Sequence, residues 1–217
     1  MENNKAISIN IRPHSFRSGV FCLAGASFPN RQHCIFKHEV VFCYLQPWAM
    51  QNIRLENLLL IDIETVSESA DFSSLNEEWQ TLWQEKVQRT LPEDVTAAEF
   101  YPQRAGVMAE FAKVICISIG YFRKDGNARQ LRLKSFYGDD EKILLQDFIA
   151  ALNKMETNNN KWSFTGHNIK EFDIPFICRR LLINGLHVPP FLDFQNMKPW
   201  ETNMVDTFQY WRFGDYK

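Results

Sequence analysis

The sequence predicts a single α/β domain in which a mixed sheet is flanked by helices. Apolar runs of strand length alternate with segments whose apolar residues repeat at helical spacing. The expected elements follow in the order strand, two hairpin strands, helix, strand, helix, strand, with an extra helix after the first strand. With 217 residues, 45% of them hydrophobic, the chain can bury one sizeable core.

The strands are indicated by short apolar runs with turn residues between them. Residues 58–63 form a continuous apolar run that ends in acids, which is typical of a buried central strand. The pair Asp125-Gly126 is a strong signal for a hairpin that joins two longer strands. These two hairpin strands are expected at residues 114–122 and 131–137, and two further strands at residues 162–167 and 203–207.

The first helix is expected to begin at a capping box formed by Ser74 and Glu77 and to run to about Gln88. Its apolar stripe comprises Leu75, Trp79, Leu82 and Trp83, for which core packing is favoured over the stacking of bases. Residues 89–110 contain two prolines and are predicted to be an irregular insertion.

Two further helices have clear boundaries. Asp139 and Asp140 open a helix whose apolar residues repeat at helical spacing until the polar loop 157–161. The second of these helices spans residues 174–184, with a proline in its first turn and Gly185 just past its end.

The first 49 residues differ from the rest of the chain. They contain no Asp, show neither helical nor strand periodicity and carry a net charge of +3, against -5 for residues 50–217. Met50 opens the segment that leads into the first strand. We expect residues 1–49 to be a non-domain extension or a mispredicted translation start, and residues 50–217 to be the domain.

Composition limits the partners of the protein. A formal net charge of -2 gives no general attraction to nucleic acid, so phosphate binding must come from a local patch or from bound cations. Five cysteines without a C-x-x-C pair argue against a disulfide framework or structural zinc, and a cytoplasmic location is expected. No apolar run approaches the ~20 residues of a membrane helix, so no membrane association is expected.

Two acids end the first predicted strand. Asp62 and Glu64 are two residues apart, so their side chains leave the same face of a strand about 6.6 Å apart. This spacing can bracket a divalent cation. Taken alone, however, an Asp-x-Glu pair is more typical of an exposed strand edge.

A third acid lies where a later strand is expected to lead into a helix. Asp173 precedes the predicted helix 174–184, a position at which an aspartate often serves only as an N-cap. Two acids at the end of an early strand and a third at a later helix start are what a two-metal phosphodiesterase site requires. There, cations ~3.5 to 4 Å apart activate water and stabilise the leaving oxygen.

These residues lie in two motifs that resemble those of the DEDD superfamily of 3′-5′ exonucleases. The segment Asp62-Ile63-Glu64-Thr65 is similar to the first motif, and Asn168-x-x-x-Phe172-Asp173-x-Pro175 is similar to the second. The closest resemblance is to the proofreading exonuclease domain of family-B DNA polymerases, and it covers roughly residues 54–217.

The resemblance implies a ribonuclease H-like fold and hydrolysis of terminal phosphodiester bonds by two Mg²⁺ or Mn²⁺ ions. The implied partner is the 3′ end of a single-stranded nucleic acid, with DNA favoured. Within the second motif, Asn168 is expected to orient the motif or the substrate end, and Phe172 to pack beneath it. The implied residues are the catalytic metal ligands Asp62, Glu64 and Asp173, and the substrate-binding residues Thr65, Asn168 and Phe172.

The third motif of the superfamily is not found in the sequence. It consists of a Tyr or His followed about one helical turn later by an Asp, on a final helix well after the fifth strand. Tyr210 and Asp215 come too soon after residues 203–207 to replace it. We therefore expect this sequence to lack the final catalytic helix, which leaves the water-activating group unassigned and predicts an inactive or weakly active chain.

Two other functions were considered. A catalytically silent nucleic-acid-binding module of the same fold is the alternative, and the lack of a third motif favours it. A phosphatase of a different α/β fold is disfavoured, because the sequence has no Gly-rich phosphate loop.

Several residues near the motifs have open roles. His167 is expected to be structural, and Asp206 either supports the site or caps a loop. Four basic residues are expected either to form a local phosphate-binding patch or to lie on a solvated helix face. They are Arg179, Arg180, Lys170 and Lys198.

Overall fold

The protein is described from a computed structural model, in which the described residues are 7–11, 53–126, 128–156, 162–198 and 201–215. Its strands form one six-stranded mixed sheet in the order β1-β4-β3-β2-β5-β6. The β1/β4, β4/β3 and β3/β2 pairs are antiparallel, and the β2/β5 and β5/β6 pairs are parallel. The strands are β1 (Ile7–Ile11), β2 (Leu58–Ser67), β3 (Ala112–Asp125), β4 (Ala128–Tyr137), β5 (Ser163–Gly166) and β6 (Met204–Asp206).

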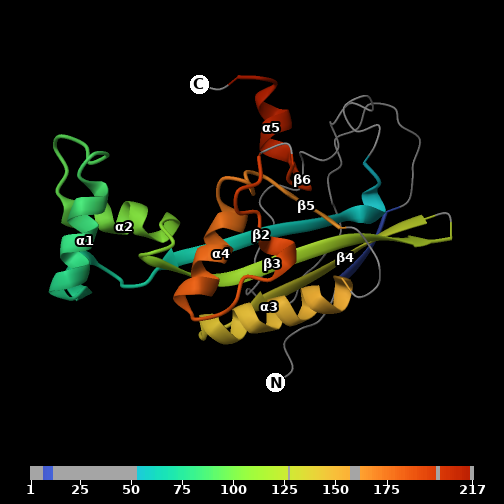
Figure 1. Cartoon of the computed structure of the whole chain (residues 1–217), viewed down its shortest axis with the longest axis horizontal. Coiled ribbons are helices and arrows are strands. Elements are labelled where there is room, and N and C mark those ends of the chain that lie inside the picture. The colour runs from blue at the N-terminus through green and yellow to red at the C-terminus, as the bar shows by residue number, and fades with distance from the viewer. Residues whose placement is uncertain (1–6, 12–52, 127, 157–161, 199–200, 216–217) are drawn as a thin grey trace.

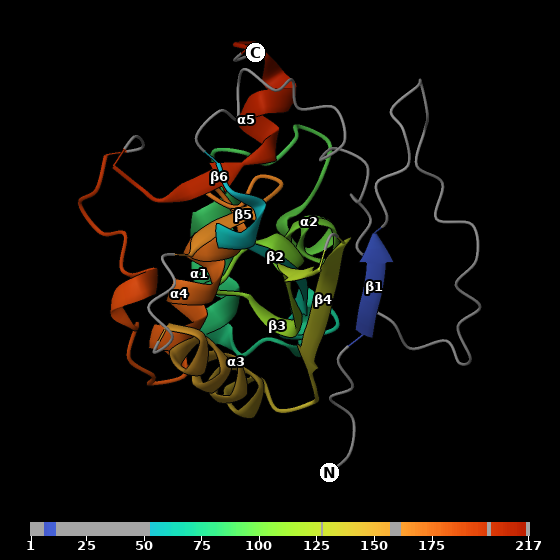
Figure 2. The ribbon, with the colours of Figure 1, turned by 90° about the vertical axis from the view of Figure 1, so that its right-hand side faces the viewer.

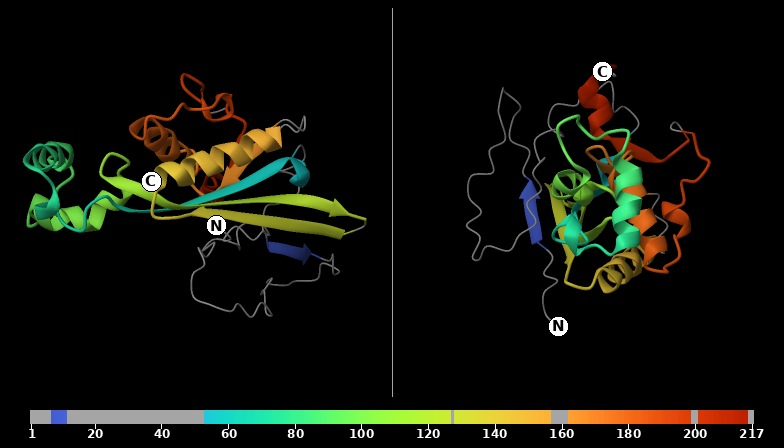
Figure 3. Two further views of the ribbon diagram at one scale, coloured as in Figure 1. Left: turned by 90° about the horizontal axis from the view of Figure 1, so that it is seen from below. Right: turned by 90° about the vertical axis from the view of Figure 1, so that its left-hand side faces the viewer.

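The sheet and its helices confirm the predicted α/β class, and the arrangement is consistent with a ribonuclease H-like fold. Helices α3 and α4 lie against the same face of the sheet (Figures 1 and 3). Figure 2 shows β4 and β1 on the opposite side of the molecule from α3 and α4. The helices are α1 (Glu77–Val87), α2 (Ala97–Arg104), α3 (Glu141–Glu156), α4 (Asp173–Ile183) and α5 (Thr207–Arg212).

The core lies between the sheet and these two helices. Alternation along β2 places Ile61 and Ile63 in the core, where both are buried among apolar residues of α3 and α4. Asp62 and Glu64 therefore leave the other face of the strand. Across the pairing with β3, Asp62 lies opposite Ser118.

The hairpin was predicted from its turn residues and is confirmed. In the register of β3 and β4, Asp125 lies opposite Ala128. Gly126 has a φ of 59°, a left-handed conformation that glycine adopts without steric cost. Both strands are longer than the sequence indicated.

Helices α3 and α4 begin and end close to where they were predicted. The Asp140 side chain accepts the backbone N–H of Ile143 at 3.1 Å and so caps the start of α3. Helix α4 ends before Gly185, whose φ of 67° suits glycine just past a helix end. The polar loop 157–161 lies outside the described residues.

Helix α1 begins differently from the prediction. Its N-cap is Asn76, whose side chain accepts the backbone N–H of Trp79, and not Ser74. Ser74 ends a short 3-10 helix that is capped by Asp71. The predicted stripe is only partly buried, because Trp83 lies in the core whereas Trp79 and Leu82 are 39% and 42% exposed.

The expectation of an irregular insertion at residues 89–110 was wrong. The segment contains α2, which is started by a capping box between Thr96 and Glu99. Helices α1 and α2 enclose a second, smaller core at one end of the sheet (Figure 1). Its buried residues are Trp83, Val87, Phe100, Tyr101, Ala105 and Phe111.

Part of the N-terminal segment joins the sheet. Residues Ile7–Ile11 pair with residues 129–133 of β4, although no strand was predicted before Met50. These residues, Ile-Ser-Ile-Asn-Ile, alternate apolar and polar side chains, a period-two strand signal that contradicts the expectation of no periodicity before Met50. The rest of residues 1–49 lies outside the described residues, and the domain boundary at Met50 stays a prediction.

Two remaining findings concern cysteines and membranes. Cys178 is a free thiol, whereas Cys116 takes part in a disulfide, contrary to the expectation drawn from the cysteine spacing. Within the described part of the chain, no helix has both the length and the apolar character needed to cross a bilayer.

Candidate active site

Asp173 of the second motif contacts the strand of the first motif where β2 extends beyond β5. The two strands pair only over residues 58–60 of β2, so the next part of β2 is not covered by β5. Asp173, the first residue of α4, reaches this part of the strand. Its Oδ1 accepts the backbone N–H of Ile63 at 3.1 Å. Because Ile63 lies between Asp62 and Glu64, the third acid contacts the strand between the first two.

Asp173 lies in an environment that opposes its ionisation. Its side chain is buried, with the residue only 4% exposed. Burial, followed by the negative charge of Asp62, raises the pKa of Asp173 to about 7, and the charge of Asp206 adds to the effect. A cation beside Asp62 and Asp173 would stabilise the ionised form of Asp173 and so offset the effects of burial and of repulsion.

Asp173 does not act as a simple N-cap. The N-cap position of α4 is occupied by Phe172, and no side chain caps the helix there. The carboxylate of Asp173 is instead directed across to β2. This contact is not what capping of its own helix requires.

Glu64 and Thr65 lie opposite a bulge in β3, where Ile115 is the extra residue between their partners Cys116 and Val114. Glu64 is exposed to solvent. The hydroxyl of Thr65 donates to the carbonyl oxygen of Gly106 at 2.6 Å, which ties β2 to the turn after α2. The substrate-binding role of Thr65 stays a prediction.

The loop that leads into Asp173 has an unusual backbone at Asn168, where φ is 65°. The side-chain Oδ1 of Asn168 is buried and has no hydrogen-bond partner among the described residues. Phe172 packs against Phe176 with ring centroids 5.3 Å apart and joins the core. This packing is the one expected of Phe172, whereas substrate binding by either residue is untested.

Asp206, for which the sequence left a supporting role and a cap open, is buried close to Asp173. It is 2% exposed, and its Oδ1 accepts the backbone N–H groups of Asn168 and Phe208 at 2.8 and 2.9 Å. Its Oδ2 accepts the N–H of Lys170 at 3.0 Å. The signal in the sequence was an acid at the end of a predicted strand. This signal does not identify Asn168 and Lys170 as partners of Asp206, because they lie 38 and 36 positions away.

His167 has structural contacts, as expected. Its Nδ1 lies 3.1 Å from the hydroxyl of Thr207, and its ring packs edge-on against Phe208. The Thr207 hydroxyl donates to the carbonyl oxygen of Gly166. These contacts join the ends of β5 and β6.

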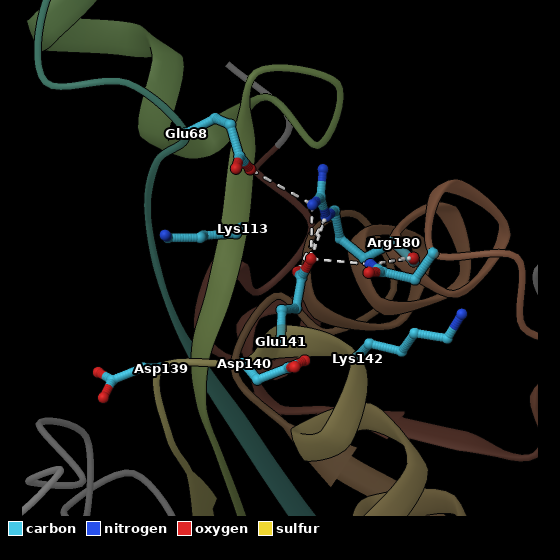
Figure 4. Close-up of a pocket in the computed structure, with 8 residues that line it drawn as sticks. Glu68, Lys113, Asp139, Asp140, Glu141, Lys142 and Arg180 are labelled. Atoms are coloured by element: carbon cyan, nitrogen blue, oxygen red, sulfur yellow. Dashed lines mark hydrogen bonds and ion pairs between the residues drawn. The ribbon is translucent and has the colours of Figure 1, made fainter.

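Both readings of Arg180 were wrong, because it neither faces solvent nor belongs to a surface patch. Its guanidinium is buried and forms a close ion pair with Glu141 of α3 (Figure 4). It also donates to the carbonyl oxygen of Ala109 at 2.9 Å and lies 3.5 Å from Glu68. The pocket of about 420 Å³ beside it is lined by four acids and three bases, so it does not resemble a phosphate site.

The other three residues of the expected patch are at least partly exposed to solvent. Arg179 is exposed on α4, and the Lys170 ammonium donates to Gln209 on α5 at 3.3 Å. Lys198 is exposed. With Arg180 buried, the four residues do not form one patch.

No group of three or more His, Cys, Asp or Glu side chains suited to a metal ion is found in the part of the chain that the structure describes. The structure therefore brings Asp62 and Asp173 together, but it does not gather Glu64 with them into a three-ligand cluster. Tyr210 lies on α5 and Asp215 just after it.

Comparison with known proteins identifies the lineage. Residues 107–215 match a protein-family model described as a predicted 3′-5′ exonuclease related to the exonuclease domain of PolB. The matched region includes Asp173 and Asp206, whereas Asp62 and Glu64 precede it. No curated protein and no solved structure matches the chain. Because the match spans half of the sequence, the chain belongs to this family of predicted 3′-5′ exonucleases related to the exonuclease domain of PolB.

Proposed function

We propose that the protein is a metal-dependent exonuclease that removes nucleotides from the 3′ end of single-stranded nucleic acid, with DNA favoured. The observation that carries this proposal is the contact of Asp173 Oδ1 with the backbone N–H of Ile63. It brings an acid of the matched family region against the strand that carries Asp62 and Glu64.

The residues proposed to hold the ions are Asp62, Glu64 and Asp173. Carboxylate oxygens are the ligands that Mg²⁺ and Mn²⁺ prefer, and the burial of Asp173 beside a like charge favours a bound cation. When bound, two such ions activate water and stabilise the leaving oxygen of the phosphodiester. Asp173 is held in place by β2, while Glu64 is exposed beside it and can reorient.

The substrate class is proposed from charge and lineage. The net charge of -2 argues against strong binding to the phosphate backbone along a duplex. A terminal phosphate held through metal ions needs no basic patch. DNA is favoured over RNA because the family is related to the exonuclease domain of a DNA polymerase.

A catalytically silent nucleic-acid-binding module is the second candidate. The specific observation in its favour is that the described residues contain no three-ligand metal cluster. Such a module would keep the fold and the Asp173 contact with β2 but would not hydrolyse its ligand.

The test is incubation of the whole chain with a 5′-labelled single-stranded DNA oligonucleotide, with Mg²⁺, Mn²⁺ or EDTA. We expect metal-dependent shortening from the 3′ end. It should be slow, because the third motif that supplies the water-activating group is not found in the sequence, and such a group contributes about 10² to 10⁴ in rate. Asp62→Asn, Glu64→Gln and Asp173→Asn should each abolish the shortening. Glu85→Gln, at an exposed acid on α1, is the matched control.

Each outcome separates the candidates. Oligonucleotide binding without any shortening, in the presence of either metal, would support the silent module. Shortening that persists in all three acid variants would remove these residues from the site. Equal shortening of a matched RNA oligonucleotide would contradict the preference for DNA.

A further inference from the structure

The loop between β5 and α4 is fastened to β6 by one buried carboxylate. Asp206 accepts backbone N–H groups from both Asn168 and Lys170 of this loop. It also accepts the N–H of Phe208 and thereby caps α5. Two of these three hydrogen bonds therefore fasten the loop to β6, and the third belongs to the cap of α5.

The loop fastened in this way ends at Asp173. Only a short stretch separates Lys170 from Asp173, and it contains two turn bonds back to the Asn168 carbonyl oxygen, from Glu171 and Phe172. The position of Asn168 relative to β6 therefore sets where α4 begins.

The loop itself needs an external anchor. A φ of 65° at Asn168 lies in the left-handed region, which costs free energy for a residue other than glycine. Such a conformation persists where surrounding contacts impose it, and the bond from its own N–H to Asp206 is such a contact.

We propose that Asp206 is a positioning residue for the candidate active site: by holding the loop 168–170 against β6, it keeps the Asp173 carboxylate on the N–H of Ile63. The inference rests on the proposed function only for its consequence for metal binding. The positioning itself is a property of the fold and can be measured without metal.

The first measurement is hydrogen exchange of the Ile63 amide by NMR in the whole, metal-free chain. Asp206→Asn replaces one acceptor oxygen with an NH₂ group, so at least one loop N–H loses its acceptor. We expect protection of the Ile63 amide to fall about tenfold or more, the equivalent of one hydrogen bond. Protection of core amides such as Ile117 should fall less.

A second variant separates the loop from the helix cap. In Asp206→Ser the hydroxyl can still cap α5, since serine is a preferred N-cap residue, but it is too short to reach both loop N–H groups. The Ile63 amide should lose protection here as well. If neither variant folds, Asp206 serves the whole fold and the local positioning role is wrong.

Glu141→Gln is the matched control. Glu141 is also a buried carboxylate that accepts a backbone N–H, from Val114 at 2.7 Å, but it belongs to the Arg180 network. Its neutralisation should lower overall stability without a selective effect on Ile63. Equal loss of Ile63 protection in Asp206→Asn and Glu141→Gln, or no loss in Asp206→Asn, would overturn the proposal.

The second measurement is Mn²⁺ affinity, followed by electron paramagnetic resonance. Loss of a residue that orients a metal ligand commonly lowers affinity about 10 to 100-fold, and we expect this for Asp206→Ser but not for Glu141→Gln. Removing a nearby negative charge also weakens cation binding, so the exchange of Ile63 decides the positioning role. If the wild-type chain binds no Mn²⁺, the proposed metal site is wrong while the Ile63 measurement still tests Asp206.

Discussion

The carboxylate of Asp173 accepts the backbone N–H of Ile63 at 3.1 Å, across 110 positions of sequence. This bond joins the start of α4 to the middle of β2. It places a buried acid beside Asp62, and the two like charges raise the free energy of the ionised, metal-free site.

The first prediction concerns the pH dependence of stability. The pKa of Asp173 is about 7 in the folded protein, above its ordinary value of 3.8, so the folded protein holds the extra proton between these two values. The free energy of unfolding should therefore fall as pH rises through this window. Asp173→Asn should be more stable than wild type by on the order of 2 kcal/mol at pH 8 and equal at pH 4.

Thermal or urea unfolding of the metal-free proteins measures this difference, with Asp147→Asn, at an exposed acid of α3, as the control. The interpretation fails if Asp173→Asn is less stable than wild type at pH 8, or if the difference between the two proteins is the same at both pH values.

The second prediction concerns Gly166, the last residue of β5. A Cβ at this position would lie 2.5 Å from the backbone oxygen of Ile61 and would also meet the side chain of Ile169. Gly166→Ala should push the loop away from β2, lower the free energy of unfolding by about 1 to 3 kcal/mol and weaken Mn²⁺ binding.

Gly138→Ala is its control, because a Cβ there would meet nothing within 4 Å. Urea unfolding and Mn²⁺ titration of both variants provide the measurement. Wild-type stability and Mn²⁺ affinity in Gly166→Ala would show that the close approach of β5 to β2 has no role.

The third prediction concerns the buried ion pair of Arg180 and Glu141. Arg180→Met leaves the Glu141 carboxylate buried without its partner, which should cost about 3 to 5 kcal/mol of stability. Arg179→Met, at the exposed neighbour, should change stability by less than about 0.5 kcal/mol. If Arg180 instead bound phosphate, its variant would lose oligonucleotide affinity while keeping its melting temperature.

The fourth prediction concerns residues 1–49. The buried residues of both core clusters come from Leu59 onward, and the described part of this segment contributes one five-residue edge strand. Under reducing conditions, which remove the contribution of the Cys116 disulfide, a chain that begins at Met50 should therefore melt within a few degrees of the whole chain. A large drop in melting temperature, measured by circular dichroism at equal concentrations, would show that residues 1–49 belong to the domain.

The sequence predicts those parts of the fold whose signals are local. The Asp-Gly turn of the β3/β4 hairpin and the Asp140 cap of α3 each depend on neighbours within a few residues, and both are confirmed. Two prolines predict irregular structure for residues 89–110, but the capping box of Thr96 and Glu99 starts α2 within this segment. Pro102 lacks only its own N–H donor, and α2 continues past it to Arg104.

The acids of the candidate site could be predicted because their signal is also local. The acids stand out because charged residues at the ends of apolar strands are conspicuous. The roles of Asp206 and Arg180 depend instead on partners 36 to 39 positions away, or 71 for the Ala109 carbonyl. No periodicity reports contacts at that distance, so a supporting acid could not be told from a cap, or a buried arginine from an exposed one.

The central claim is that Asp62, Glu64 and Asp173 form one metal site, and Mn²⁺ titration followed by electron paramagnetic resonance tests it most directly. Wild type and Glu85→Gln should bind Mn²⁺ weakly and equally, whereas Asp62→Asn, Glu64→Gln and Asp173→Asn should each lose affinity at least about tenfold, as expected for the loss of a charged ligand. Undiminished binding in any one of these three variants would contradict the account.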